Sequence, residues 1–133
     1  MKRKGWVMLD RTDRKPVVLV VEDDALLRLD AVETMKEAGF EVIEAADAEA
    51  AIAHLRTRQD IAVVFTDIEL PGSMDGLMLA AAIRDRWPPI KVIAASGHFG
   101  SDDERLPTGE PLLVKPYSSH VLKTAISDLV GQR

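Results

Sequence analysis

The amino-acid sequence predicts an α/β protein with a doubly wound, five-stranded parallel sheet, an architecture written (βα)5. Short runs of apolar, mostly β-branched residues alternate with longer stretches of helical period, which is the pattern of parallel strands joined by crossover helices. The chain has 133 residues, of which 47% are apolar, and no Cys. This length suits one domain with one core, and the absence of Cys excludes a disulfide framework and thiolate zinc sites.

The first strand and helix are predicted most clearly. Residues 17–21 (Val-Val-Leu-Val-Val) form an unbroken apolar run, which predicts a strand buried on both faces. A helix is predicted from about residue 25, with Asp24 as its N-cap and Gly39 at its left-handed C-terminal cap. Its buried face is predicted to carry Leu27, Ala31 and Met35, which are spaced four residues apart.

The next strand, helix and strand follow the same rules. Residues 40–44 predict a second strand, and Asp47 is the predicted N-cap of the helix after it. Residues 61–66 predict a third, buried strand, and Asp67 stands at its end. The second helix is predicted to bury Ala48, Ala51, Ile52 and Leu55.

The second half of the chain adds two helices and two strands. A helix is predicted over 75–86, and Pro88 and Pro89 end it because Pro cannot continue a helix. Strands are predicted over 90–95 and 112–114, and a last helix over 119–130 with Ser118 as its N-cap. The residues predicted to face the core are Leu79, Ala80 and Ile83 in the third helix and Val121, Leu122, Ala125, Ile126 and Leu129 in the last.

Residues 97–111 break the pattern at the place where a fourth helix is expected. The segment contains three Gly and two Pro and is free of both only over 101–106. One or two helical turns at most are therefore predicted there.

Charge is distributed unevenly along the chain. Residues 1–16 carry six Lys or Arg and two Asp, a net +4, whereas residues 17–133 carry 11 basic and 20 acidic residues, a net −9. We expect residues 1–16 to be a basic, flexible leader and residues 17–133 to be the folded domain. The acidic body argues against direct nucleic-acid binding. No apolar run is long enough for a membrane span and no secretory signal is visible, so a cytoplasmic protein is expected.

Polar side chains follow four of the predicted strands. Glu22 and Asp23 come after the first strand, Asp67 after the third, Ser96 after the fourth and Lys115 after the fifth. The carboxyl ends of parallel strands meet at one edge of the sheet, where ligands bind in open α/β folds. Three carboxylates in one pocket repel each other and call for a cation, and all-oxygen ligation favours Mg²⁺ or Mn²⁺.

The remaining groups of this cluster suit a phosphoryl group. An Asp carboxylate can act as a nucleophile and form an acyl phosphate, with Asp67 the best candidate because it is the lone acid at the end of an apolar strand. A bound cation and Lys115 would neutralise the phosphoryl oxygens, and the Ser96 hydroxyl can donate a hydrogen bond to one of them.

These residues occur in motifs that resemble a known family, the receiver domain of two-component response regulators of the chemotaxis-regulator type. The resemblance covers about residues 17–130 and implies the flavodoxin-like receiver fold, here of a single-domain type with a shortened fourth helix. The motifs are Val20-Val21-Glu22-Asp23-Asp24, Phe65-Thr66-Asp67-Ile68-Glu69-Leu70-Pro71 with Asp75-Gly76, Ala95-Ser96-Gly97, and Val114-Lys115-Pro116.

The resemblance implies a role for each matching residue. Asp67 would accept a phosphoryl group from a sensor histidine kinase or a histidine phosphotransfer protein, in a reaction that requires Mg²⁺. Asp23 and Asp67 would bind the metal directly, Glu22 through water and Glu69 through its backbone carbonyl. Ser96 would move toward the phosphoryl group and Lys115 would pair with it, across a Lys115–Pro116 bond that resembles the cis peptide of the family.

Three departures from the family pattern concern the switch. Leu112 stands where family members often carry an aromatic switch residue, and Tyr117 follows Lys115-Pro116 instead. The loop from Asp67 to Asp75 is one residue longer than in most receivers. Tyr117 and Phe99 are predicted either to be core residues or to gate the segment over 97–111.

Two residues are predicted to set the lifetime of the phosphorylated state. Glu69 and His98 each lie two residues beyond a site residue, Asp67 and Ser96. In the receiver family these positions border the path of the water that hydrolyses the phosphoaspartate. We hypothesise that Glu69 and His98 control that hydrolysis.

The expected function is that of a bacterial signalling protein rather than an enzyme. Phosphorylation of Asp67 would switch a protein-interaction surface. Through this surface the chain would contact a downstream protein, and a homodimer is a further possibility. Two alternatives compete with this interpretation. One is a Mg²⁺-dependent phosphatase with an aspartate nucleophile, and the other is an adaptor of receiver fold that works without phosphorylation.

Overall fold

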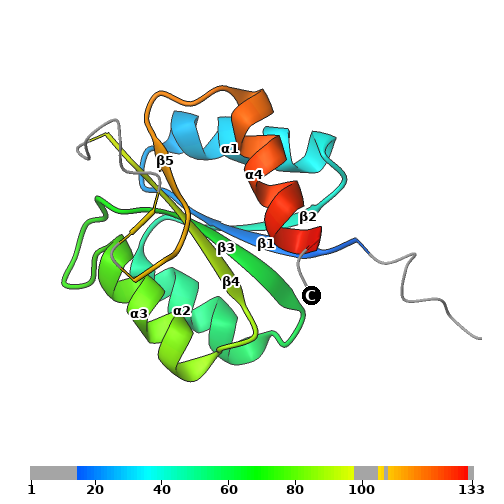
Figure 1. Cartoon of the computed structure of the whole chain (residues 1–133). Coiled ribbons are helices and arrows are strands. Elements are labelled where there is room, and N and C mark those ends of the chain that lie inside the picture. Colours follow the sequence, from blue (N-terminus) through cyan, green and yellow to red (C-terminus); the bar gives the residue numbers. More distant parts are fainter. Residues whose placement is uncertain (1–14, 98–104, 107, 132–133) are drawn as a thin grey trace, which may run out of the picture.

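The computed structural model describes residues 15–97, 105–106 and 108–131. Five parallel strands form one sheet in the order β2-β1-β3-β4-β5, and helices connect the first four strands along the chain (Figure 1). This topology confirms the predicted doubly wound α/β fold. The strands are β1 (Val17–Val21), β2 (Glu41–Ala45), β3 (Ile61–Asp67), β4 (Lys91–Ser96) and β5 (Leu112–Val114).

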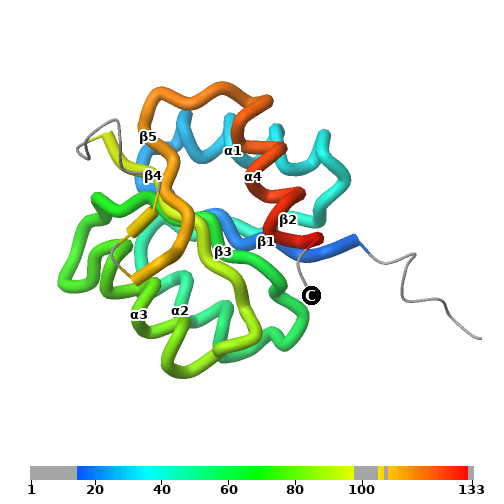
Figure 2. Tube along the Cα trace, in the orientation of Figure 1, coloured from blue at the N-terminus to red at the C-terminus, as the bar shows by residue number. Residues whose placement is uncertain are grey.

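The helices cover both faces of the sheet. The four are α1 (Ala25–Glu37), α2 (Ala48–Thr57), α3 (Gly76–Arg86) and α4 (Ser119–Gly131). Helices α2 and α3 pack on one face, whereas α1 and α4 pack on the other, as the tube in Figure 2 also shows. None of these helices combines the length and apolarity that a bilayer span requires.

Strand β1 contributes to both halves of the core. Val17, Leu19 and Val21 face the cluster formed with α2 and α3, whereas Val18 and Val20 face the cluster formed with α1 and α4. Alternate side chains of a strand point to opposite faces, so a strand covered on both sides must be apolar at every position. All five residues are buried, which confirms the interpretation of the unbroken apolar run.

The predicted helix caps are present. The side chain of Asp24 accepts hydrogen bonds from the backbone N of Leu26 and Leu27, and that of Asp47 accepts one from Ala50 at 2.8 Å. Ser118 Oγ accepts a hydrogen bond from the backbone N of Val121 at 3.0 Å. Gly39 follows α1 with φ +97°, a left-handed conformation that favours glycine.

Two residues predicted to face the core do not. Leu27 in α1 is 46% exposed and Val121 in α4 is 44% exposed. Both lie in the first turn of a helix on the same face of the sheet. In α1 the whole first turn, residues 25–27, is exposed, whereas in α4 the neighbouring Leu122 takes the buried position in place of Val121. The other residues predicted to face the core in these two helices are buried or half-buried.

The segment between β4 and β5 contains no helix among its described residues, 97, 105–106 and 108–111. Residues 101–104 of the predicted turns lie outside the described residues. Leu106 is buried and packs with Ile68, Ala94 and Leu112. Arg105 forms an antiparallel bridge with Pro111, so residues 105–111 turn back on themselves and lead into β5.

Gly76 starts α3 directly against the end of β3. Its backbone N donates a hydrogen bond to the carbonyl oxygen of Ile68 at 2.8 Å. A Cβ atom at position 76 would lie 2.1 Å from the carbonyl oxygen of Asp67 and 2.6 Å from the Cα of Ile68. Only glycine permits this approach, which fixes the backbone that carries the Asp67 side chain.

We therefore expect Gly76→Ala to lower the free energy of unfolding by about 3 kcal/mol, because backbone atoms must move to admit the methyl group. Urea denaturation measures this change. Gly131→Ala is the matched control, since a Cβ there meets nothing within 4 Å, and it should leave stability unchanged or slightly higher. Equal stability of the two variants would contradict the close approach.

Candidate functional site

The structure brings the predicted site residues together at the carboxyl edge of the sheet. Glu22 follows β1, Asp67 ends β3, Ser96 ends β4 and Lys115 follows β5. Glu22, Asp67 and Ser96 are at most 7% exposed, whereas Asp23 is exposed. The site is therefore a buried polar cluster with one carboxylate at its mouth.

Lys115 joins the two buried carboxylates. Its Nζ lies 3.2 Å from Glu22 Oε1 and 3.2 Å from Asp67 Oδ1. Its backbone N donates a hydrogen bond to the carbonyl oxygen of Ser96 at 2.9 Å, which continues the pairing of β5 with β4. The Lys115–Pro116 peptide bond is cis, as the family resemblance implied.

The three acids of the cluster are close enough to share one cation. One carboxylate oxygen from each of Glu22, Asp23 and Asp67 lies within 4.8 Å of the others. A donor set made only of oxygens suits a hard divalent cation such as Mg²⁺. The residues present therefore fit the metal that receiver domains usually bind at an acidic cluster.

The cluster is short of positive charge. Burial raises the pKa of Glu22 and of Asp67, although the ammonium of Lys115 partly offsets the rise in both. Burial opposes the charge on Lys115 as well, but the carboxylates of Asp67 and Glu22 prevail and raise its pKa. One ammonium thus serves two buried carboxylates, and an added divalent cation would be favourable.

Glu69 contacts the site in a way that the sequence did not predict. The hydroxyl of Ser96 donates a hydrogen bond to Glu69 Oε2 at 2.8 Å. The backbone N of Glu69 lies 3.4 Å from Asp67 Oδ1. Residues 69 and 96 are far apart in sequence, so only the fold reveals this hydrogen bond. The Glu69 side chain itself is largely exposed.

Tyr117 is half-buried and packs against the core cluster that lies between the sheet and α1 and α4. Its ring packs edge-on against Phe65, with centroids 5.8 Å apart and an interplanar angle of 78°. Burial raises the pKa of its phenol above the usual value. Leu112, at the position of the usual aromatic switch residue, is buried beside Leu106. His98 and Phe99 lie outside the described residues.

Arg28 and Asp24 both donate hydrogen bonds to Glu22, and neither was predicted as part of the site. Arg28 Nη1 donates a hydrogen bond to the carbonyl oxygen of Glu22 at 2.8 Å, and Arg28 Nε pairs with Glu44 at 3.1 Å. The backbone N of Asp24 donates to Glu22 Oε2 at 3.1 Å. The position of Arg28, one turn into a helix that begins just after Glu22, could have indicated the first of these contacts.

Comparison with known proteins assigns the chain to a family. The model of the response regulator receiver domain matches residues 18–127, and the chain belongs to this family. Receiver domains are signalling domains of two-component systems. The predicted class of protein is thereby confirmed.

Individual relatives agree with this assignment. The chain is 36% identical over 118 residues to the response regulator protein FleR of Pseudomonas aeruginosa, covering 86% of this chain and 24% of FleR. It is 34% identical over 116 residues to the transcriptional regulatory protein PdtaR of Mycobacterium tuberculosis, covering 85% of this chain and 52% of PdtaR. The chain thus spans about half or less of these relatives.

A solved structure shows the same fold. The response regulator receiver protein from Sinorhizobium medicae is 31% identical and superposes with a TM-score of 0.77, covering 87% of this chain and 94% of that one. The likeness extends over almost the whole of the solved chain.

Stability should depend on pH in a way set by the buried carboxylates. Because the pKa of Asp67 is raised in the folded chain, its charged form costs stability that increases as the pH rises from the ordinary Asp value through the raised one. We expect Asp67→Asn to raise the free energy of unfolding by about 1 kcal/mol at neutral pH, with a smaller gain near pH 4. Urea denaturation in EDTA at both pH values measures the difference.

Asp60→Asn is the control, because the pKa of Asp60 is shifted in the opposite direction from that of Asp67. Hydrogen bonds from Arg58 lower the pKa of Asp60, so its carboxylate does not oppose folding at neutral pH and its replacement should give no gain. An Asp67→Asn variant that is less stable than the wild type at neutral pH would contradict the assigned effect of burial.

Proposed function

We propose that this chain is the phosphoacceptor receiver of a two-component or phosphorelay system, with Asp67 as the acceptor. The observation that carries the proposal is the arrangement of Lys115 between Glu22 and Asp67, with Asp23 beside them. Asp67 is the acid at the end of the central strand β3, and it lies close both to the ammonium of Lys115 and to the other two acids of the cluster. A phosphoryl group on Asp67 would therefore meet positive charge on arrival.

The acidic cluster would hold Mg²⁺ or Mn²⁺. Asp23 and Asp67 would bind the cation directly, Glu22 through a water molecule and Glu69 through its backbone carbonyl. The bound metal would supply positive charge to the phosphoryl oxygens. Burial of Glu22 and Asp67 supports this assignment, because their raised pKa values reflect carboxylates that lack sufficient neutralisation.

The chemical step would be a displacement at phosphorus. A carboxylate oxygen of Asp67 attacks the phosphorus of a phosphohistidine on a sensor histidine kinase or a histidine phosphotransfer protein. The new P–O bond forms as the P–N bond breaks, and the leaving imidazole nitrogen keeps the electron pair and takes a proton from solvent. Lys115, 3.2 Å from Asp67 Oδ1, would pair with the transferred group.

Phosphorylation would then compete for the Ser96 hydroxyl. That hydroxyl donates to Glu69 in this structure, and it would have to leave Glu69 to donate to a phosphoryl oxygen. The charged phosphoryl group and the Glu69 carboxylate also repel each other. Glu69 is therefore placed to oppose the switched state, which extends its hypothesised control of phosphoryl lifetime.

The wider role would be that of a cytoplasmic bacterial switch. A surface altered by phosphorylation would contact a downstream protein or a second copy of the chain, without direct contact to nucleic acid. Residues 17–133 would form the receiver and residues 1–16 a flexible basic leader, of which residues 1–14 lie outside the described residues. Self-dephosphorylation would be slow, so the chain would act as a switch rather than an enzyme.

The acceptor assignment is tested by chemical phosphorylation. We expect acetyl phosphate with MgCl₂ to add one phosphoryl group to the wild type, detected by intact mass, because Lys115 and a divalent cation neutralise the transferred charge. Asp67→Asn should abolish the adduct, and EDTA or Asp23→Asn should strongly reduce it. Asp75 caps α3 by accepting a hydrogen bond from the backbone N of Met78 at 2.8 Å. Because Asn is also a good N-cap, Asp75→Asn is the matched control and should be phosphorylated normally.

Two other results would contradict the proposal and favour one of the alternative functions. Steady release of phosphate from para-nitrophenyl phosphate would indicate the phosphatase. A folded wild type that takes up no phosphoryl group from acetyl phosphate or from a phosphorylated kinase would indicate the adaptor.

The role of Glu69 is tested by the decay of the adduct. We expect Glu69→Ala to slow phosphoryl loss by about two-fold or more, because Ser96 is released to bind the phosphoryl group and a repelling charge is removed. Glu69→Gln removes the charge while keeping a hydrogen-bond acceptor, and its rate of phosphoryl loss should lie between those of the wild type and Glu69→Ala. Unchanged decay in both Glu69→Ala and His98→Ala would exclude control by these residues.

A further inference from the structure

Half of strand β4 has an open edge. Strand β5 pairs only with Ala94, Ala95 and Ser96 of β4, so Lys91, Val92 and Ile93 have no strand neighbour on that side within the described part of the chain. The backbone N of Ala94 donates to Pro111 at 3.0 Å, and alternate residues of a strand direct their backbone groups to the same side. The N–H and C=O of Val92 therefore point to the open edge.

The sequence keeps this edge open. If the pairing of β4 with β5 continued in the same register, the C=O of Val92 would accept from the backbone N of residue 111, and its N–H would donate to the carbonyl of residue 109. Pro111 has no N–H to donate. The carbonyl of Gly109 accepts a hydrogen bond from Arg105 Nη1 at 2.8 Å. The first continuing hydrogen bond is thus impossible, and in place of the second the Gly109 carbonyl is engaged by Arg105. Val92 has no backbone partner on this side among the described residues.

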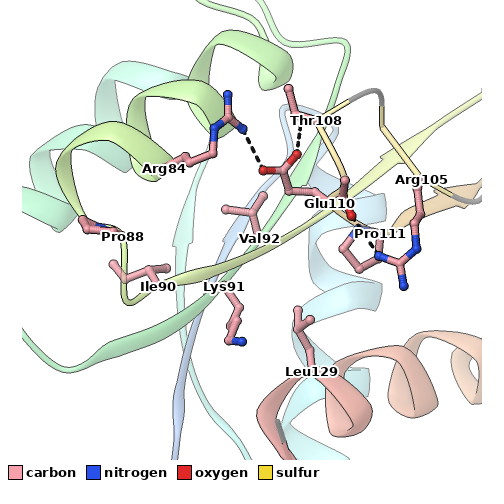
Figure 3. Close-up of a pocket in the computed structure, with 11 residues that line it drawn as sticks. Arg84, Pro88, Ile90, Lys91, Val92, Arg105, Thr108, Glu110, Pro111 and Leu129 are labelled. Atoms are coloured by element: carbon pink, nitrogen blue, oxygen red, sulfur yellow. Dashed lines mark hydrogen bonds and ion pairs between the residues drawn. The ribbon is translucent and has the colours of Figure 1, made fainter. Parts of the chain in front are cut away.

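A cavity of about 360 Å³ lies at this edge. Its floor is apolar and is formed by Val92, Pro111 and Leu129 (Figure 3). Lys91 and Arg105 bring cationic heads to its two sides. Within the described part of the chain, neither of these two side chains pairs with a carboxylate.

The one carboxylate of the cavity is already engaged. Glu110 pairs with Arg84 at 2.7 Å and accepts a hydrogen bond from Thr108, and Figure 3 shows its carboxylate turned toward these two residues. The hydrogen bonds from Thr108 and Arg84 lower its pKa although burial opposes this. Three cations thus surround one carboxylate, in a body whose net charge over residues 17–133 is −9.

We propose that this cavity binds an acidic, extended peptide segment of a partner protein. One peptide residue would pair its C=O and N–H with the backbone of Val92 and so add a short strand to the open edge. Carboxylate side chains of the segment would reach Lys91 and Arg105, and an apolar side chain between them, directed to the other face of the sheet, would cover Val92. The site lies at the opposite end of β4 from Ser96 and does not depend on phosphorylation of Asp67.

Charge selects this occupant over the alternatives on the molecule. The leader, residues 1–16, carries a net +4 and would be repelled by the cationic rim. A second copy of the chain would bring its own Lys91 and Arg105 to the same edge if it added its β4 by two-fold symmetry. An acidic segment satisfies both the backbone groups and the unpaired cations.

The test uses the full chain labelled with ¹⁵N and a capped hexapeptide of alternating valine and glutamate. We expect saturable amide shifts centred on Val92, and slowing of hydrogen exchange at the Val92 amide by about ten-fold or more on binding. The Ala94 amide is hydrogen-bonded already and should change little. A hexapeptide of alternating valine and lysine should not bind. Raising NaCl from about 50 to 500 mM should weaken the binding of the acidic peptide.

Variants assign the binding to the cavity. Lys91→Glu and Arg105→Glu should each weaken the binding of the acidic peptide by about five-fold or more. Lys36→Glu makes the same change of charge on α1, none of whose residues lines the cavity, and this variant should bind the acidic peptide as the wild type does. Where Arg105→Glu disturbs the turn over 105–111, Arg105→Gln removes the charge and keeps donors for Gly109.

Three results would overturn the proposal. Equal affinity in the Lys91 and Arg105 variants would place the peptide elsewhere. Binding without protection of the Val92 amide would exclude strand addition. A Val92 amide that is already protected in the full chain without peptide would show that the leader or a second copy covers the edge.

Discussion

The pairing of Lys115 with both Glu22 and Asp67 is the interaction on which the site depends. Each partner stands at the end of a different strand, so the ammonium holds together loops that the sheet alone only brings near. Without it, two buried carboxylates would lose the ammonium that pairs with both of them, a costly arrangement. The same ammonium opposes the rise that burial causes in the pKa of Asp67. One side chain thus stabilises the cluster and favours the charged form of the proposed acceptor.

Much of the fold follows from local physics in the sequence. Strand β1 is apolar at every position because helices cover both faces of the sheet, and the capping residues Asp24 and Asp47 mark where helices begin. The sequence pattern is wrong at Leu27 and Val121, since helical period shows which side chains share a face but not which turns of a helix the rest of the protein covers. The strand ends, by contrast, are fixed by topology, which explains why the site cluster could be predicted.

Contacts between distant residues mark the limit of sequence analysis. The hydrogen bond from Ser96 to Glu69 joins residues on different loops, and no spacing or period predicts it. Pro111 was recognised only as a helix breaker, because its effect on β4 requires the register between β4 and β5. These two features lie near opposite ends of β4, so one strand carries both the proposed switch hydroxyl and the open edge at Val92.

Because Gly76 packs closely on the backbone of Asp67, the position of Asp67 does not depend on the length of the loop between these two residues. The loop is fastened at its base by the hydrogen bond from Gly76 to Ile68, while Pro71, Gly72 and Ser73 at its tip are exposed. A chain closed at its base can gain residues at its tip at a small entropic cost. A residue added at this exposed tip therefore need not move the backbone of Asp67.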